Sequence, residues 1–213
     1  MATFEKGILG GFSGKVGNVV GSKWRGKNVM RSLPQRGKYT ATAKQEEQQQ
    51  KFKTVIGFLS PLVNILSLYF GSPQGDKSRA NLATSYHLKN AVISTPLGMV
   101  MDYPKVLISK GDLRGIDGGT FAAGAAQTLN LGWQDNSGQG KATTTDELMV
   151  VVYAPDLNLF YTNVAVATRD ATTATVTLPN FMASFEVEVW ASFSKPGTNF
   201  AAISTYMGAV TVL

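Results

Sequence analysis

The residue types that most often carry catalysis are scarce in this 213-residue sequence. It contains no cysteine and a single histidine, His87. Without cysteine there are no disulfides, no thiolate nucleophile and no cysteine-ligated zinc or iron–sulfur site. One imidazole without partners cannot build a histidine-rich metal site or a histidine-dependent triad. We interpret His87 as a helix-surface or packing residue, and we expect the protein not to be an enzyme and to need no cofactor.

Carboxylates offer a second kind of chemistry. Asp135, Asp146 and Glu147 are candidate ligands for a hard cation, because such ions prefer oxygen ligands. They fall in the expected loops of an acidic segment, where scattered acids are ordinary. The sequence therefore predicts no metal site.

Glycine and lysine recur near the N-terminus in a way that superficially suggests an anion cradle. The two stretches are Gly14-Lys15-Val16-Gly17 and Gly21-Ser22-Lys23. A P-loop also needs a preceding strand, a fixed Gly–Lys–Ser/Thr spacing and a following helix, and none of the three is predicted here. Glycines repeated within strands more often mark a close approach of two backbones.

Charge separates the N-terminus from the rest of the chain. Residues 1–40 carry eight Lys/Arg against one acid, Glu5, for a net charge of +7. Residues 41–114 carry +4, and residues 115–213 carry three bases against eight acids, or −5. The N-terminal segment cannot bury enough apolar surface to offset its own ordering entropy, so a partner or the rest of the chain must hold it.

We predict that residues 1–40 are an assembly arm that docks on copies of the same chain. Attraction between the basic arm and the acidic segment would steer head-to-tail association, and an arm added to a sheet edge would satisfy its backbone donors. Two alternatives stay open: the arm folds onto its own chain, or it binds nucleic acid. The predicted contact residues, with three glycines that allow close approach, are Lys15, Lys23, Trp24, Arg25, Lys27, Arg31, Gly14, Gly17 and Gly21.

The arm needs a scaffold, and its alternating residues predict a β-hairpin. Val16–Arg25 and Val29–Leu33 are the expected strands, joined by a turn at residues 26–28. A polar linker is expected from Pro34 to Ala41.

Two helices are expected next. The first begins at Thr42, where Gln45 completes a capping box, and Pro61 should kink it or start a second helix. Val55–Phe70 is interrupted and shorter than a bilayer span, so we expect a buried helix and no membrane contact. The second helix is predicted at Ser78–Ile93, ending at residues 95–98. The predicted buried faces are Phe52, Val55, Ile56, Leu59, Val63 and Leu66 in the first helix, and Leu82, Tyr86 and Ile93 in the second.

Short β-branched and aromatic runs predict an antiparallel β-sandwich after Tyr103. The alternation at Phe185–Trp190 predicts one buried and one wet face. The expected fold class is α+β, with an arm at residues 1–40, a helical subdomain at 41–102 and a sandwich at 103–213. The predicted strands are Val106–Ile108, Thr128–Trp133, Glu147–Tyr153, Asn163–Thr168, Thr173–Leu178, Phe185–Phe193 and Ile203–Leu213.

The chain resembles known families in two respects. The strand pattern around Trp133, residues 150–153, residues 175–179 and residues 185–191 resembles fibronectin type III and other immunoglobulin-like sandwiches. A second resemblance, to an uncharacterised bacterial and phage-associated family, covers nearly the whole chain and implies the domain order above and a phage connection. It is carried by Gly14-Lys15-Val16-Gly17-Asn18-Val19-Val20-Gly21, Trp24-Arg25-Gly26, Arg31-Ser32-Leu33-Pro34, Phe58-Leu59-Ser60-Pro61-Leu62 and Tyr86-His87-Leu88-Lys89-Asn90-Ala91.

The resulting expectation is a non-enzymatic structural subunit, in the first place a phage virion component such as a capsid, neck or tail accessory protein. Its partners would be copies of itself and other virion proteins, and its location the virion, assembled in the bacterial cytoplasm. The N-terminus shows no apolar run of signal-peptide length. The alternatives are a bacterial filament or cell-surface subunit, a nucleic-acid-binding protein, and a carbohydrate-binding or adhesive sandwich.

Overall fold

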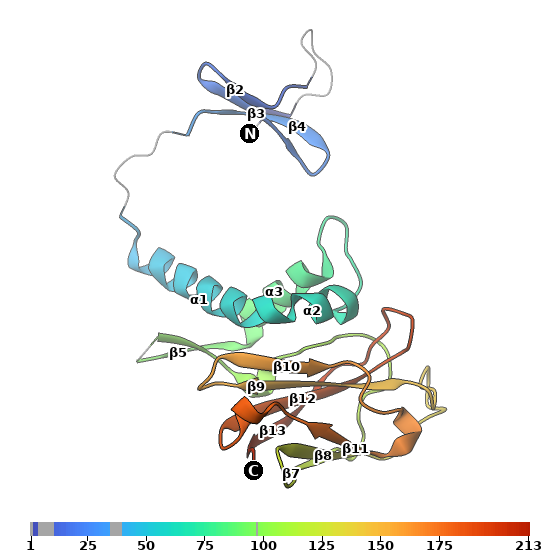
Figure 1. The fold of residues 1–213 in the computed structure, drawn as a ribbon. Helices are drawn as coiled ribbons and strands as arrows, with labels where there is room; N and C mark the ends of the chain where they lie inside the picture. The colour runs from blue at the N-terminus through green and yellow to red at the C-terminus, as the bar shows by residue number, and fades with distance from the viewer. Residues whose placement is uncertain (1, 4–10, 35–39, 97) are drawn as a thin grey trace. The chain divides into compact units, whose positions relative to one another are not determined.

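The computed structural model describes residues 2–3, 11–34, 40–96 and 98–213 and divides the chain into two compact units, Met1–Glu46 and Glu47–Leu213 (Figure 1). The N-terminal unit contains a four-stranded antiparallel sheet in the order β1-β4-β3-β2. Its strands are β1 (Ala2–Thr3), β2 (Gly14–Val16), β3 (Val19–Trp24) and β4 (Lys27–Ser32). Most of the predicted linker, residues 35–39, lies outside the described residues.

The predicted hairpin is present as β3 and β4, with two differences in its turns. The first predicted strand is divided at Gly17, which has φ +57° and lies between the paired residues Val16 and Val19. The second turn consists of Arg25 and Gly26, with φ 50° and 79°. Two consecutive positive φ angles are those of a type I′ turn, whose twist matches that of the strands it joins. The turn therefore begins one residue earlier than predicted.

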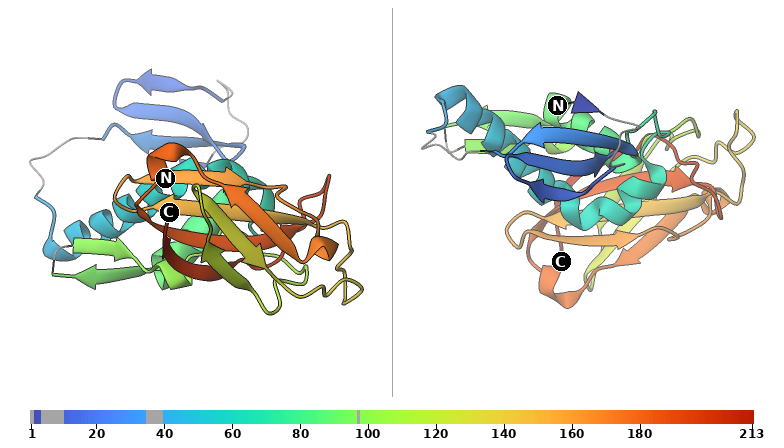
Figure 2. Two further views of the ribbon diagram at one scale, coloured as in Figure 1. Left: turned by 60° about the horizontal axis from the view of Figure 1, so that its bottom comes forward. Right: turned by 90° about the horizontal axis from the view of Figure 1, so that it is seen from above.

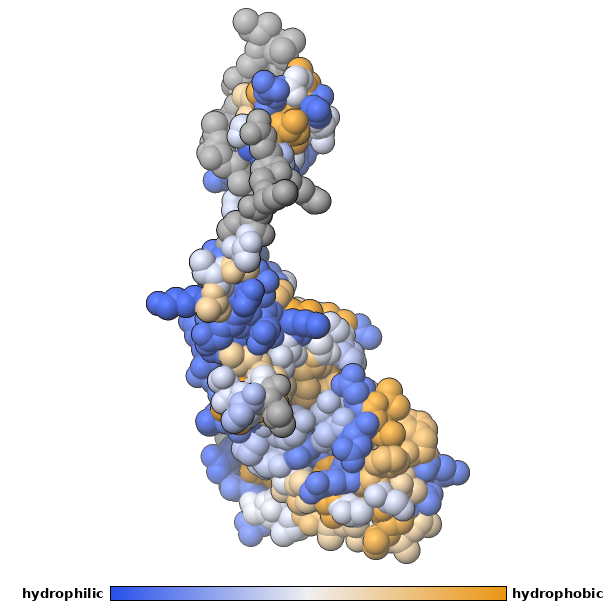
Figure 3. All heavy atoms as spheres, turned by 90° about the vertical axis from the view of Figure 1, so that its left-hand side faces the viewer, coloured by the Kyte–Doolittle hydropathy of each residue, from blue (hydrophilic) through white to orange (hydrophobic). Residues whose placement is uncertain are grey.

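The first predicted helix forms α1 (Ala43–Leu59), which begins just before the boundary of the larger unit, the 3₁₀ turn η1 (Ser60–Leu62) and α2 (Val63–Tyr69). The amide of Thr42 donates to Gln45 Oε1 at 3.0 Å, which is one half of the predicted capping box. Pro61 lies in η1 and separates the two helices, as expected. Residues 44–50 are all exposed, and Figure 3 shows them as a hydrophilic (blue) surface at the start of α1.

Half of the predicted buried face of these helices is confirmed, because Val55, Leu59 and Leu66 are buried. Phe52, Ile56 and Val63 are instead 52%, 36% and 47% exposed, since apolar residues occur on more than one side of these helices. Ala43–Tyr69 is long and apolar enough to cross a membrane by length and composition, a test that core helices also pass. The residues that pack into the core are Val55, Phe58, Leu59, Leu62, Ile65, Leu66 and Phe70.

The second predicted helix is shorter than expected. α3 (Arg79–Asn90) starts at the N-cap Ser78, whose hydroxyl accepts the Asn81 amide at 3.3 Å. It ends before Ile93 because the following residues form a two-stranded ribbon, β5 (Val92–Thr95) and β6 (Gly98–Met101). Ile93 was predicted to face inward and is instead 44% exposed.

The β-sandwich is confirmed, and its two sheets are antiparallel. One sheet has the order β10-β9-β12-β13 and the other β11-β8-β7. Counted from β7, the first, second and fifth strands of the sandwich (β7, β8 and β11) therefore form one sheet, and the other four strands form the second. Immunoglobulin-like folds also divide their strands between two packed antiparallel sheets. The strands are β7 (Thr120–Ala123), β8 (Thr128–Gly132), β9 (Glu147–Ala154), β10 (Leu159–Asn163), β11 (Thr173–Thr177), β12 (Glu186–Ser194) and β13 (Thr205–Thr211).

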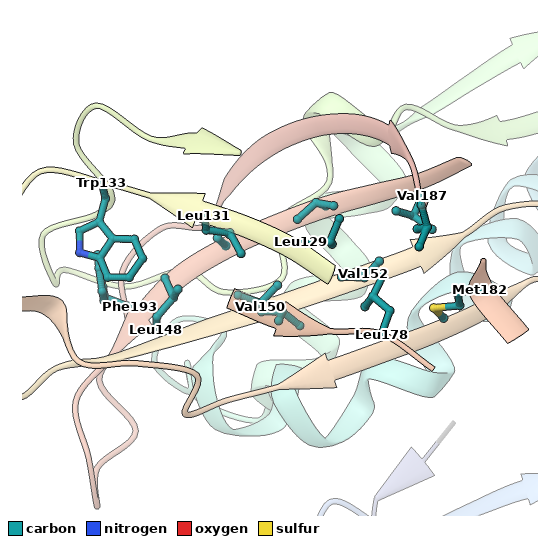
Figure 4. Packing of buried hydrophobic residues seen from close by; sticks show 14 of the residues in the cluster. Leu129, Leu131, Trp133, Leu148, Val150, Val152, Leu178, Met182, Val187 and Phe193 are labelled. Atoms are coloured by element: carbon teal, nitrogen blue, oxygen red, sulfur yellow. The ribbon is translucent and has the colours of Figure 1, made fainter. Parts of the chain in front are cut away.

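The sheet of β10, β9, β12 and β13 is covered on both faces, by the three-stranded sheet on one side and by the helices on the other. The larger unit therefore has three layers (Figure 2). On β9, Leu148, Val150 and Val152 point into the sandwich core that Figure 4 shows, and Met149 and Val151 point into the helical layer. Burial on both faces explains the unbroken apolar run of this strand. The predicted wet face of β12 is largely dry, since Glu188 is 9% exposed and Trp190 is fully buried.

Of the predicted strands after residue 103, one is absent and one is displaced, and β5, β6 and β7 were not predicted. Val106–Ile108 follows the 3₁₀ turn η2 (Tyr103–Lys105) and is not a strand, because its amides donate to side chains: Leu107 to His87 Nε2 and Ile108 to Ser204 Oγ. The strand predicted at Asn163–Thr168 lies earlier, as β10, and β7 was not predicted. The α+β class holds. The helices share one core with β9 and β12 across the expected boundary at residues 102–103, and the three-domain division stays a prediction.

Candidate functional site

The N-terminal sheet sorts the predicted contact residues by the register of β2, β3 and β4. Lys15 pairs with Val20, and Val20 pairs with Arg31. Trp24 pairs with Lys27. Directly opposed residues project to the same face, and so do residues two apart on one strand. Lys15, Lys27, Arg31 and Trp24 therefore lie on one face of the sheet, which we call the basic face.

Two of the predicted contact residues are arranged differently. Lys23 pairs with Asn28 and lies on the opposite face, with Val16 and Val19. Arg25 occupies the β3–β4 turn, where its guanidinium carbon lies 4.7 Å from the centre of the Trp24 ring. This distance is within the range of a cation–π contact. Trp24 remains 55% exposed.

The three predicted glycines have internal explanations. Gly14 and Gly17 have φ +118° and +57°, and no atom of the described residues lies within 4 Å of where a Cβ would be. Gly21 is buried, and its Cβ would lie 2.5 Å from the carbonyl oxygen of Phe12 and 2.6 Å from its ring. The close approach that Gly21 permits is therefore to Phe12, which precedes β2 in the same unit. Contact of any of these residues with a partner stays a prediction.

His87 is fully buried in the helical layer. Its Nδ1 lies 2.8 Å from the carbonyl oxygen of Ala83, and its Nε2 accepts the amide of Leu107 at 3.2 Å. Because Nε2 is an acceptor, the ring is neutral with its proton on Nδ1. Burial lowers the pKa of His87 below its usual value, and the two backbone hydrogen bonds oppose that shift. The packing interpretation is the one that this geometry fits.

The three carboxylates considered for a cation are placed differently: Asp135 Oδ1 accepts the Ser137 amide at 2.9 Å, Glu147 begins β9, and Asp146 forms a buried ion pair. Asp146 and Arg169 are both fully buried, and Arg169 Nε donates to Asp146 Oδ2 at 3.1 Å. Trp133 Nε1 donates to the carbonyl of Arg169 at 2.7 Å. This hydrogen bond links the segment around Arg169 to Trp133 of the sandwich core. Within the described residues no group of three or more His, Cys, Asp or Glu is placed to hold a metal ion.

One feature of the larger unit was not found from the sequence. A hollow of 330 Å³ opens at the end of the sandwich between the β8–β9 and β12–β13 connections. Its lining residues come from three parts of the chain that are far apart in sequence, and they meet only in the folded sandwich. They are Leu113, Lys141, Lys195, Thr198 and Phe200.

Comparison with known proteins places the chain in a family. Residues 11–208 match a family described as a family of unknown function (DUF6266). The chain belongs to DUF6266. Among curated proteins the comparison finds no match. Because the match begins at residue 11, the DUF6266 pattern includes the basic face as well as the sandwich.

Among solved structures, this DUF6266 protein is similar to the fibronectin type III domain of the human collagen alpha-1(XX) chain. The identity is 14% and the TM-score 0.33, over 49% of this chain and 88% of that one. The sandwich assignment rests on the strand order of the two sheets.

Proposed function

We propose that this protein is a non-enzymatic assembly subunit whose N-terminal sheet binds a neighbouring copy of the same chain. The observation that carries the proposal is the register that gathers Lys15, Lys27, Arg31 and the half-exposed Trp24 on the basic face. Residues 115–213 supply the opposite charge, with three bases against eight acids. Opposite charges steer association, and an exposed tryptophan supplies the apolar area that anchors an interface.

The particle that we favour is a phage virion, in which the protein would be a capsid, neck or tail accessory component assembled in the bacterial cytoplasm. This identity is supported by the sequence resemblance alone. A bacterial filament or surface assembly would use the same contact. Either particle fits a small basic sheet that forms a compact unit of its own, Met1–Glu46.

The proposal is tested by two matched substitutions in the full chain, Lys27→Glu and Lys23→Glu. Both lysines are exposed and differ in the face of the sheet they occupy. We expect Lys27→Glu to weaken self-association by about tenfold, the effect of about 1.4 kcal/mol, and Lys23→Glu to weaken it much less. Sedimentation velocity at low and high salt measures both. Equal effects of the two substitutions, or a wild-type chain that stays monomeric at every concentration, would refute the proposal.

Two further measurements separate the alternatives. Deletion of residues 1–36 should leave a folded monomer that no longer assembles. Nucleic-acid binding through the basic face requires an affinity for DNA that falls steeply with salt, because each phosphate contact releases a counterion. A flat salt response removes that alternative. Binding of the wild-type chain to a glycan array, retained after Lys27→Glu, would favour the adhesive sandwich instead.

A further inference from the structure

The loop hollow of the larger unit combines positive charge with an apolar floor. Lys141 comes from the β8–β9 connection, and Lys195 and Phe200 come from the β12–β13 connection. Both connections lie at the right-hand end of the sandwich in Figure 1. Lys141 Nζ lies 5.7 Å from the centre of the Phe200 ring, and Phe200 is 53% exposed. We call this hollow the loop pocket.

The position of the two lysines is unusual for this domain. Residues 115–213 contain three bases, Lys141, Arg169 and Lys195. Arg169 is buried in its ion pair with Asp146. The two exposed bases of residues 115–213 therefore both line the loop pocket, where an anion would offset their like charge.

The polar groups of the loop pocket select among anions and neutral ligands. The hydroxyl of Thr198 is engaged within its own loop, because it donates to the Lys195 carbonyl at 2.9 Å and accepts the Phe200 amide at 3.3 Å. The lysine ammonium groups are donors only. A sugar needs acceptors as well as donors, whereas a carboxylate needs donors alone. The apolar floor of Leu113 and Phe200 fits an aliphatic or aromatic side chain beside that carboxylate.

The loops that form the pocket are held by their own hydrogen bonds. The Lys195 amide donates to the Phe200 carbonyl at 2.9 Å, and the Ala142 amide donates to the Gln139 carbonyl at 3.1 Å. Little ordering is therefore required when a ligand binds. Two adjoining hollows of 470 and 280 Å³ share Lys141 and Phe200, respectively, with the loop pocket. An extended ligand thus has room on both sides of it.

We infer that the loop pocket binds an acidic peptide segment of a partner protein, with a carboxylate between Lys141 and Lys195 and a neighbouring apolar side chain on Phe200. The adjoining hollows are lined by Asp112 together with basic side chains, Arg114 in one and Arg79 and Lys110 in the other. A long polyanion such as nucleic acid would also have to lie along residues 115–213, which carry three bases against eight acids. A single carboxylate needs only the local charge. The site is independent of the basic face, which would be repelled by these lysines.

The test uses three short peptides with blocked ends in a glycine–serine frame. The first carries phenylalanine followed by glutamate, the second replaces the glutamate with glutamine, and the third replaces the phenylalanine with alanine. Fluorescence anisotropy measures their binding to the full chain, to Lys141→Met/Lys195→Met, and to the control Lys77→Met, an exposed lysine outside the pocket. Methionine keeps the apolar stem and removes the charge.

We expect the first peptide to bind, and the glutamine peptide and the double variant each to weaken binding about tenfold or more. The alanine peptide should also bind more weakly, because it leaves the Phe200 floor uncovered. Lys77→Met should bind like the wild type. If the double variant does not fold, Lys141→Arg/Lys195→Arg should retain binding and Phe200→Ala should lose it. Equal binding of the glutamate and glutamine peptides, no binding at all, or tighter binding of oligothymidylate at the same pocket would overturn the inference.

Discussion

The buried pair of Arg169 and Asp146 makes a sharp prediction about stability. Arg169 donates to Asp146, Asn136 and the carbonyl of Arg114, and its guanidinium carbon lies 3.9 Å from the centre of the Phe193 ring. Arg169→Met keeps a chain of similar length and removes the charge and all three hydrogen bonds. The Asp146 carboxylate then stays buried, with the amide and hydroxyl of Thr143 as its remaining donors among the described residues.

The expected loss of unfolding free energy is about 3–5 kcal/mol, the cost of leaving one charge of a buried pair without its partner. For a domain of this size, each kcal/mol lowers Tm by about 2–4 °C. The predicted shift is therefore between about 6 and 20 °C. Asp146→Asn should cost a similar amount, because it leaves a guanidinium buried without its counter-charge.

The double variant decides whether this reasoning is right. Arg169→Met with Asp146→Asn removes both charges together, so its loss should be clearly smaller than the sum of the two single losses. Urea unfolding, followed by the fluorescence of the buried Trp133 and Trp190, measures all four proteins. A loss of less than about 1 kcal/mol for Arg169→Met, or strict additivity in the double variant, would refute the argument.

Three further predictions concern single residues. Because burial lowers the pKa of His87 in the fold, stability should be constant above the unfolded pKa of about 6.5 and fall below it, by at most about 1.4 kcal/mol per pH unit; an unchanged slope in His87→Gln would contradict this origin. Gly57 lies inside α1, and no atom of the described residues comes within 4 Å of the position that an added Cβ would take. Gly57→Ala should therefore raise the free energy of unfolding by about 0.5–1 kcal/mol, which a higher urea midpoint would show. Gly21→Ala should loosen the N-terminal sheet, since its Cβ would lie 2.5 Å from the Phe12 carbonyl oxygen; faster amide exchange in β3 than in the wild type is the measurement.

Sequence patterns predicted the elements whose conformation is set by residues close by in the sequence. The hairpin of β3 and β4, the β9 and β12 strands and the break at Pro61 all follow from residue type and spacing. Val106–Ile108 has the same β-branched texture and forms no strand, because the acceptors of its amides are His87 Nε2 and Ser204 Oγ. Those acceptors are 20 and 96 residues away in sequence from their donors. No window of sequence contains such information.

The candidate contact residues divide in the same way. The sequence is sufficient to single out the basic, glycine-rich segment, but the face that each lysine occupies depends on register. A strand divided at Gly17 and a turn at Arg25 and Gly26 place Lys27 with Trp24 and leave Lys23 on the other face. Sequence counting treats these two lysines as equivalent. The structure makes them a matched pair for experiment.

Net charge by segment is a weaker guide to surface charge than it first looks, because burial removes charges unevenly. In residues 115–213, one of three bases and two of eight acids, Arg169, Asp146 and Glu188, are buried. The segment still exposes an acidic surface, which is what the proposed docking of the basic face requires. Its two exposed lysines line one pocket. The proposed docking of the basic face and the inferred acidic ligand of the loop pocket would therefore use different parts of this segment, so one result can fail in experiment without the other.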